Sequence, residues 1–149
     1  LDGMPAANPD VDLTLHVTEC PKFTDLSGLS SVRRFDSLYL RELGALASLH
    51  GLEGAESASG VTITANPALV SLDGMGPLVS VGMVEPNTQS NVEIEDNPLL
   101  TSLSAWSALR EVGGSLSVKG NALLPQADAE AWAAGVVVGG NSYVGDNAP

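Results

Sequence analysis

Hydrophobic positions recur along this chain in a fixed order. A short alternating pair comes first, and single apolar residues then follow at every third position. The alternating apolar-x-apolar pair begins at Leu15, Leu38, Val61, Val92 and Leu116. These starts lie 23, 23, 31 and 24 residues apart, and a truncated sixth pair begins 20 residues later, at Val136. The pattern is an internal repeat, and it predicts about six coils of 23–24 residues.

The spacing within each repeat predicts its local structure. In the third repeat the apolar positions after the strand are Leu69, Leu72, Met75, Leu78 and Val81. Alternation indicates a short strand with one buried face, whereas spacing by three fits neither a strand nor an α-helix and suits 3₁₀-like turns. One repeat cannot bury its apolar side alone, so the repeats must stack with their strands in a parallel sheet, about 4.8 Å apart. We therefore predict a β-solenoid, that is, a parallel β-helix.

We expect residues 1–149 to form a single domain, with residues 1–14 as a partial first coil and 136–149 as the last coil and C-terminal tail. Residues 125–135 carry Pro near the start, Gly at the end and apolar residues at helical spacing, which predicts a short α-helix that caps the last coils. About eight extra residues in 83–91 are polar and turn-rich. They predict a loop, for which both recognition and neutral insertion remain open.

An asparagine column lies five residues after the strand starts, at Asn66, Asn97, Asn121 and Asn141. Side-chain amides at such a corner can bond the exposed backbone of their own and neighbouring coils, so the column predicts a structural ladder. The first two repeats have Cys20 and Leu43 at this position, and we expect no ladder there. We interpret the lone Cys20 as a small buried side chain.

The repeats resemble those of bacterial proteins with receptor L domain-like repeats. The resemblance covers nearly the whole chain and rests on residues 61–75, 92–103 and 109–116, which include Val61-Thr62-Ile63-Thr64-Ala65-Asn66-Pro67 and Val92-Glu93-Ile94-Glu95-Asp96-Asn97-Pro98. It implies a right-handed leucine-rich-repeat-like β-helix. It also implies an extracellular or outer cell-surface location, often as a lipoprotein or as part of a larger surface protein. Two repeats without the asparagine and the 83–91 insertion depart from the family pattern.

Composition excludes some partners. The formal net charge is −12, spread along the chain, and a phosphate backbone requires a basic face, so nucleic acid is not an expected partner. No apolar run is long enough to cross a membrane, so we expect no membrane insertion, and the chain shows no signal peptide of its own. The single cysteine cannot form an internal disulfide.

Candidate chemistry is sparse, and we predict neither an enzyme nor a cofactor. His16 and His50 fall at different columns of different repeats, and no cluster has the spacing of zinc ligands. Glu93 and Glu95 project from one strand face about 6.6–7 Å apart, a distance that acid and base roles in a glycosidase would tolerate. With Asp96 they also suggest a calcium site. Solvated charge on a half-exposed strand explains the same residues without either role.

The outward strand positions form the natural binding platform of a solenoid. An aromatic ring beside an arginine, as at Tyr39 and Arg41, is typical of interface hot spots. The candidate binding residues are Tyr39, Arg41, Thr62, Thr64, Glu93, Glu95, Lys119 and, in the inserted loop, Asn87. The sequence thus favours a non-catalytic recognition or adhesion module for a protein or glycan. A structural spacer or a scaffold that packs against copies of itself is the alternative.

Overall fold

The computed structural model describes residues 12–82 and 90–149. The described part contains one α-helix, α1 (Gln126–Ala134), and two 3₁₀ turns, η1 (Ser27–Leu29) and η2 (Ser104–Trp106). All other regular structure is strand: β1 (Leu13–Thr18), β2 (Arg34–Arg41), β3 (Ser57–Ala58), β4 (Val61–Thr64), β5 (Ser80–Val81), β6 (Val92–Glu95), β7 (Glu111–Val112), β8 (Leu116–Lys119), β9 (Val137–Val138) and β10 (Ser142–Gly145).

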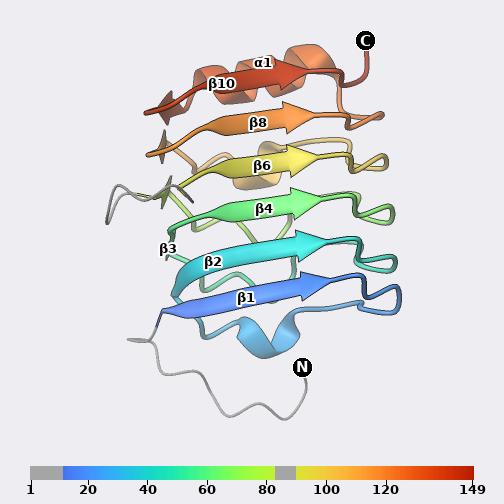
Figure 1. Cartoon of the computed structure of the whole chain (residues 1–149), viewed down its shortest axis with the longest axis vertical. Helices are drawn as coiled ribbons and strands as arrows, with labels where there is room; N and C mark the ends of the chain where they lie inside the picture. The colour runs from blue at the N-terminus through green and yellow to red at the C-terminus, as the bar shows by residue number, and fades with distance from the viewer. Residues whose placement is uncertain (1–11, 83–89) are drawn as a thin grey trace.

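All ten strands belong to one open parallel sheet, in the order β10-β8-β6-β4-β2-β3-β5-β7-β9, with β1 also paired to β2. Figure 1 shows β1, β2, β4, β6, β8 and β10 stacked in one row, which we call the front row. Residues 38–41 of β2 pair with β4 in the front row, while Arg34 and Phe35 pair with β3. Strands β3, β5, β7 and β9 form a second row, the back row. The coarse prediction of stacked parallel strands is confirmed, and the open sheet is compatible with a solenoid-like arrangement.

The segments between strands bury a side chain at every third residue. Leu69, Leu72, Met75, Leu78 and Val81 are each at most 1% exposed, as the spacing predicts. Backbone bonds explain the period: Met75 donates its N–H to the Leu72 carbonyl and Leu78 donates to the Met75 carbonyl. These are i→i+3 bonds of 3₁₀ type, which place every third side chain on the same side of the segment. Leu, Val and Met side chains therefore fill the core in layers.

Each front-row strand is followed by a residue with a left-handed backbone conformation. The residue after the strand has a positive φ at Glu19, Glu42, Ala65, Asp96, Gly120 and Asp146. At the first five of these residues the N–H donates to a carbonyl at the end of the neighbouring strand or just past it, as in Ala65 N–H to the Glu95 carbonyl at 3.0 Å. This conformation costs roughly 1–2 kcal/mol for a residue with a Cβ. The recurrence shows that the fold requires the same corner in every front-row strand.

An asparagine ladder follows these corners directly. The Asn97 Oδ1 accepts the backbone N–H of Asn66 at 3.1 Å, and its Nδ2 donates to the Ile63 carbonyl at 3.0 Å. Asn121 repeats this pattern toward Asn97, and all three asparagines are fully buried. At the other end, the Leu43 N–H donates to Asn66 Oδ1, so the buried Leu43 forms the end of the ladder.

The prediction for Asn141 is wrong. Asn147 supplies the last rung, because its Oδ1 accepts the Asn121 N–H at 3.2 Å, whereas Asn141 is exposed. The cause lies in the last coil: the front-row strand there begins at Ser142, which pairs with Leu116, and not at Val136. The Val137–Val138 pair forms β9 in the back row.

The helix α1 lies at the C-terminal end of the stack, behind β10 in Figure 1, close to the predicted range. Gln126 joins the helix to the ladder, since the Gln126 Oε1 accepts a hydrogen bond from the Asn147 Nδ2 at 3.2 Å. Trp132 packs on the fully buried Trp106 with ring centroids 5.9 Å apart, and its Nε1 donates to the Trp106 carbonyl. The helix is therefore held to the last coils by both polar and aromatic contacts.

The interpretation of Cys20 as buried is also wrong, because the side chain is exposed. It lies just past β1, and within the described residues β1 pairs only with β2. Leu43 and Asn66, at the same repeat position in inner coils, are buried. Within the described residues no further strand covers Cys20.

Candidate functional site

The front-row strands present two parallel lines of outward side chains, which together we call the front face. On each inner strand the alternate residues are buried, as Val92 and Ile94 are on β6, so the others point away from the core. Strand register defines the first line as His16, Tyr39, Thr62, Glu93, Ser117 and Tyr143. It defines the second line as Thr18, Arg41, Thr64, Glu95, Lys119 and Gly145.

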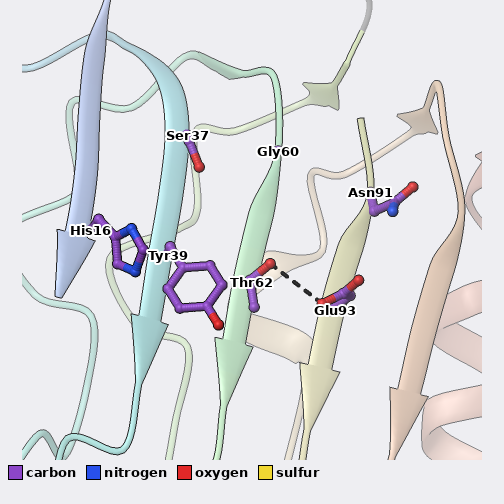
Figure 2. A pocket seen from close by; sticks show the side chains of 7 residues that line it. All are labelled: His16, Ser37, Tyr39, Gly60, Thr62, Asn91 and Glu93. Carbon is purple, nitrogen blue, oxygen red and sulfur yellow. Dashed lines mark hydrogen bonds between the residues drawn. The ribbon is translucent and has the colours of Figure 1, made fainter. Parts of the chain in front are cut away.

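Two adjoining hollows lie on this face. The larger, of about 400 Å³, is lined by His16, Ser37, Tyr39, Gly60, Thr62, Asn91 and Glu93 (Figure 2). The smaller, of about 260 Å³, is lined by Tyr39, Arg41, Thr62, Thr64, Ala65, Glu93, Glu95 and Asp96. They share Tyr39, Thr62 and Glu93, so they form one continuous depression, which we call the front groove. Its size is within the range of small-ligand sites, about 300–1,000 Å³ for a pocket.

Aromatic side chains form one side of the groove. His16 and Tyr39 lie side by side with ring centroids 4.4 Å apart and planes tilted by 50°. In Figure 2 the Tyr39 ring lies over the sheet and reaches toward Thr62. The strand register places His16 directly opposite Tyr39, which accounts for their contact.

Acidic and hydroxyl side chains form the other side. The Thr62 Oγ1 donates to Glu93 Oε2 over 3.5 Å, a long bond that leaves most of the acceptor capacity of this carboxylate open. Glu95 is more fully engaged: Ser117 Oγ donates to its Oε1 at 2.6 Å, and Lys119 Nζ lies 3.4 Å from its Oε2. Of the two carboxylates, Glu93 is the one available to a ligand.

Arg41 adds a fixed positive charge at the end of the groove. Its Nη2 lies 2.9 Å from Glu42 Oε1. A hydrogen bond with Tyr39 first, and then the charge of Glu42, raise the pKa of Arg41 above its usual value. The guanidinium is exposed, so it can still meet a ligand.

The structure brings together most of the candidate binding residues. Those lining the groove are Tyr39, Arg41, Thr62, Thr64, Glu93 and Glu95. Lys119 lies beside them through its ion pair with Glu95, and Asn87 lies outside the described residues. Their part in binding stays a prediction.

Sequence reasoning missed Tyr143. It occupies the first line of the front face opposite Ser117, and its side chain is 51% exposed. The apolar alternation starts the last front-row strand at Val136 instead of Ser142, so Tyr143 was not recognised as an outward strand position. The signal was the Asp146-Asn147 pair, which matches Asp96-Asn97 at the end of β6 and identifies the preceding residues as a front-row strand.

Other chemistry finds little support in the described part of the chain. No group of three or more His, Cys, Asp or Glu side chains there is arranged to hold a metal ion, including the calcium site considered at Glu93, Glu95 and Asp96. His16 contacts Tyr39, whereas His50 Nδ1 lies 3.1 Å from Glu53 Oε1 in a return segment. None of the described helices has the length and apolar character needed to cross a bilayer.

No family model, no curated protein and no solved structure matches the chain.

Proposed function

We propose that this chain is a non-catalytic recognition module that binds a protein or glycan on its front face. The observation that carries the proposal is the front groove, a continuous depression built by four neighbouring strands around Tyr39, Thr62 and Glu93. Concave surfaces with a few convergent polar groups are the usual form of a ligand site.

The rigidity of the face supports binding. Tyr39, Thr62 and Glu93 each lie on a strand hydrogen-bonded on both sides, so their backbones are fixed before a ligand arrives. Preorganised side chains lose less conformational freedom on association, which favours affinity. The buried asparagine ladder holds the corner beside each of these strands.

Finer features of the proposal rest on the repeat pattern. We infer a leucine-rich-repeat-like, right-handed β-helix similar to receptor L domains, displayed outside the cell or on its outer surface. Such a scaffold suits exposed recognition because it presents one regular face while the loops and outward side chains set the ligand.

The test is capture of ligands from a glycan array and from a panel of purified surface proteins. Wild type is compared with the Tyr39→Ala/Arg41→Ala double variant, which removes the ring and the guanidinium from the groove. A matched control, His50→Ala/Arg33→Ala, removes an imidazole and a guanidinium that are exposed off the front face.

We expect one or more specific ligands to bind wild type and the control but not the groove variant. Equal binding by all three proteins would place recognition elsewhere. Absence of any ligand would favour the structural spacer instead, and size-exclusion chromatography with light scattering would then test whether copies of the chain assemble.

A further inference from the structure

Two tyrosine rings mark the two halves of the front face. Tyr39 and Tyr143 belong to the same line of outward side chains, separated by Thr62, Glu93 and Ser117 on the strands between them. Four strand spacings separate their positions, which is about 19 Å at roughly 4.8 Å each. A ligand that contacts both rings must therefore be an extended chain lying across the strands.

Tyr143 lies close along its own strand rather than extending straight into solvent. A Cβ built on Gly145 would lie only 2.8 Å from the Tyr143 hydroxyl oxygen and 3.0 Å from Cζ, so the ring rests where Gly145 has no side chain. The hydroxyl donates to Asp146 Oδ2 at 3.1 Å, which fixes the ring and raises the pKa of Tyr143. With half of its surface exposed, the ring offers a fixed platform for stacking.

The side chains between the rings are hydroxyls and one carboxylate. Glu93 forms no ion pair with any cation in the described part of the chain, and its bond from Thr62 is 3.5 Å long. Carboxylate oxygens and hydroxyls are the partners that the hydroxyl groups of a sugar require, and aromatic rings pack against apolar faces of sugar rings.

Charge on the second line favours an uncharged ligand. Arg41, Glu95 and Lys119 alternate in sign along it, so a chain carrying charge of one sign would meet repulsion at one or more positions. The net charge of −12 further opposes anionic ligands such as acidic polysaccharides.

We propose that the front face binds a neutral, linear oligosaccharide laid across the strands, stacked on Tyr39 and Tyr143 and hydrogen-bonded to Glu93. The inference rests on the proposed recognition function and names its ligand class. Tyr143 becomes a binding residue at the far end of the site.

The experiment titrates the chain with neutral linear saccharides of glucose, mannose, galactose and N-acetylglucosamine, each as a disaccharide and a hexasaccharide, by isothermal calorimetry. A lysine-rich peptide and an acidic hexasaccharide are the comparison ligands. The proteins are wild type, Tyr39→Ala, Tyr143→Ala and Tyr143→Phe, with circular dichroism to verify that each is folded.

We expect a neutral hexasaccharide to bind, and each alanine variant to weaken it roughly fivefold or more, the loss expected for a stacked aromatic ring. Tyr143→Phe retains the ring and should restore most of the affinity, and the disaccharide should bind more weakly than the hexasaccharide. Loss with Tyr39→Ala but not with Tyr143→Ala would overturn the inference and leave the recognition function intact. Binding of the lysine-rich peptide but of no neutral saccharide would do the same. If neither these ligands nor the array and protein panel gives binding, both proposals fail.

Discussion

Replacing Asn97 by alanine should destabilise the fold far more than replacing a surface asparagine. Asn97 is fully buried, and its side chain accepts the Asn66 N–H while donating to the Ile63 and Glu95 carbonyls. Removing it leaves the buried Asn66 N–H and the buried Ile63 carbonyl without these partners, at about 1–3 kcal/mol for each unsatisfied group. We expect a loss of about 3–5 kcal/mol in the free energy of unfolding, a large share of the roughly 5–15 kcal/mol typical of a domain.

The assay is equilibrium unfolding in urea, followed by tryptophan fluorescence, to which the buried Trp106 and the neighbouring Trp132 both contribute. Asn141→Ala is the matched control, because Asn141 is exposed and outside the ladder, and it should change stability by less than about 0.5 kcal/mol. Asn147→Ala, at the partly buried end of the ladder, should be intermediate and serves if Asn97→Ala does not fold. A loss below about 1 kcal/mol for Asn97→Ala, or equal losses for Asn97→Ala and Asn141→Ala, would refute the ladder as a source of stability.

Three further changes test the corners and turns by the same unfolding assay. Ala65→Gly should stabilise the protein by up to about 1 kcal/mol because Ala65 has a φ of 54°, whereas Ala68→Gly, where φ is not positive, should destabilise it. Gly74→Ala should lower the free energy of unfolding by at least about 2 kcal/mol, since Gly74 has a φ of 112° and the new Cβ would lie 2.0 Å from the Leu49 carbonyl oxygen. Gly76→Ala is the control and should be tolerated, because its new Cβ would have its nearest contact at 3.8 Å. Glu53 has a pKa below its usual 4.5 because the Gly51 N–H donates to its carboxylate. The ionised carboxylate therefore stabilises the folded protein fully above pH 4.5, and this contribution is lost as the pH falls through the folded-state pKa. Glu53→Gln should therefore make stability less dependent on pH below 4.5, and an unchanged acid limb would contradict this assignment.

The layered core could be predicted because each buried position requires an apolar residue. Spacing by three at Leu72, Met75 and Leu78 follows directly from the i→i+3 backbone bonds, so the sequence pattern reflects the backbone geometry. The back row could not be predicted, because strands such as β5 are two residues long, and Val81 of β5 continues the spacing by three without the alternation that indicates a strand.

The front-row strand of the last coil was misplaced because α1 changes the spacing between repeat positions there. Val136, Val137 and Val138 satisfy the apolar alternation, but α1 takes up the preceding residues, and Ser142 is the residue that reaches the Leu116 register. The left-handed corner is the better marker, since Asp146 repeats the backbone of Asp96.

Alternation identified which strand positions point outward, and so most of the candidate site. The groove itself depends on side-chain conformations that no single repeat encodes. His16 leans on Tyr39 and Lys119 turns toward Glu95, and these contacts join residues 23 and 24 positions apart.

The central claim is that the front face binds the ligand, and amide chemical-shift mapping tests it most directly. The labelled wild-type protein is titrated with the strongest binder from the glycan array and the protein panel. We predict that the largest shifts fall on β2, β4 and β6 around Tyr39, Thr62 and Glu93. Shifts confined to α1 or to the return segments would contradict the claim.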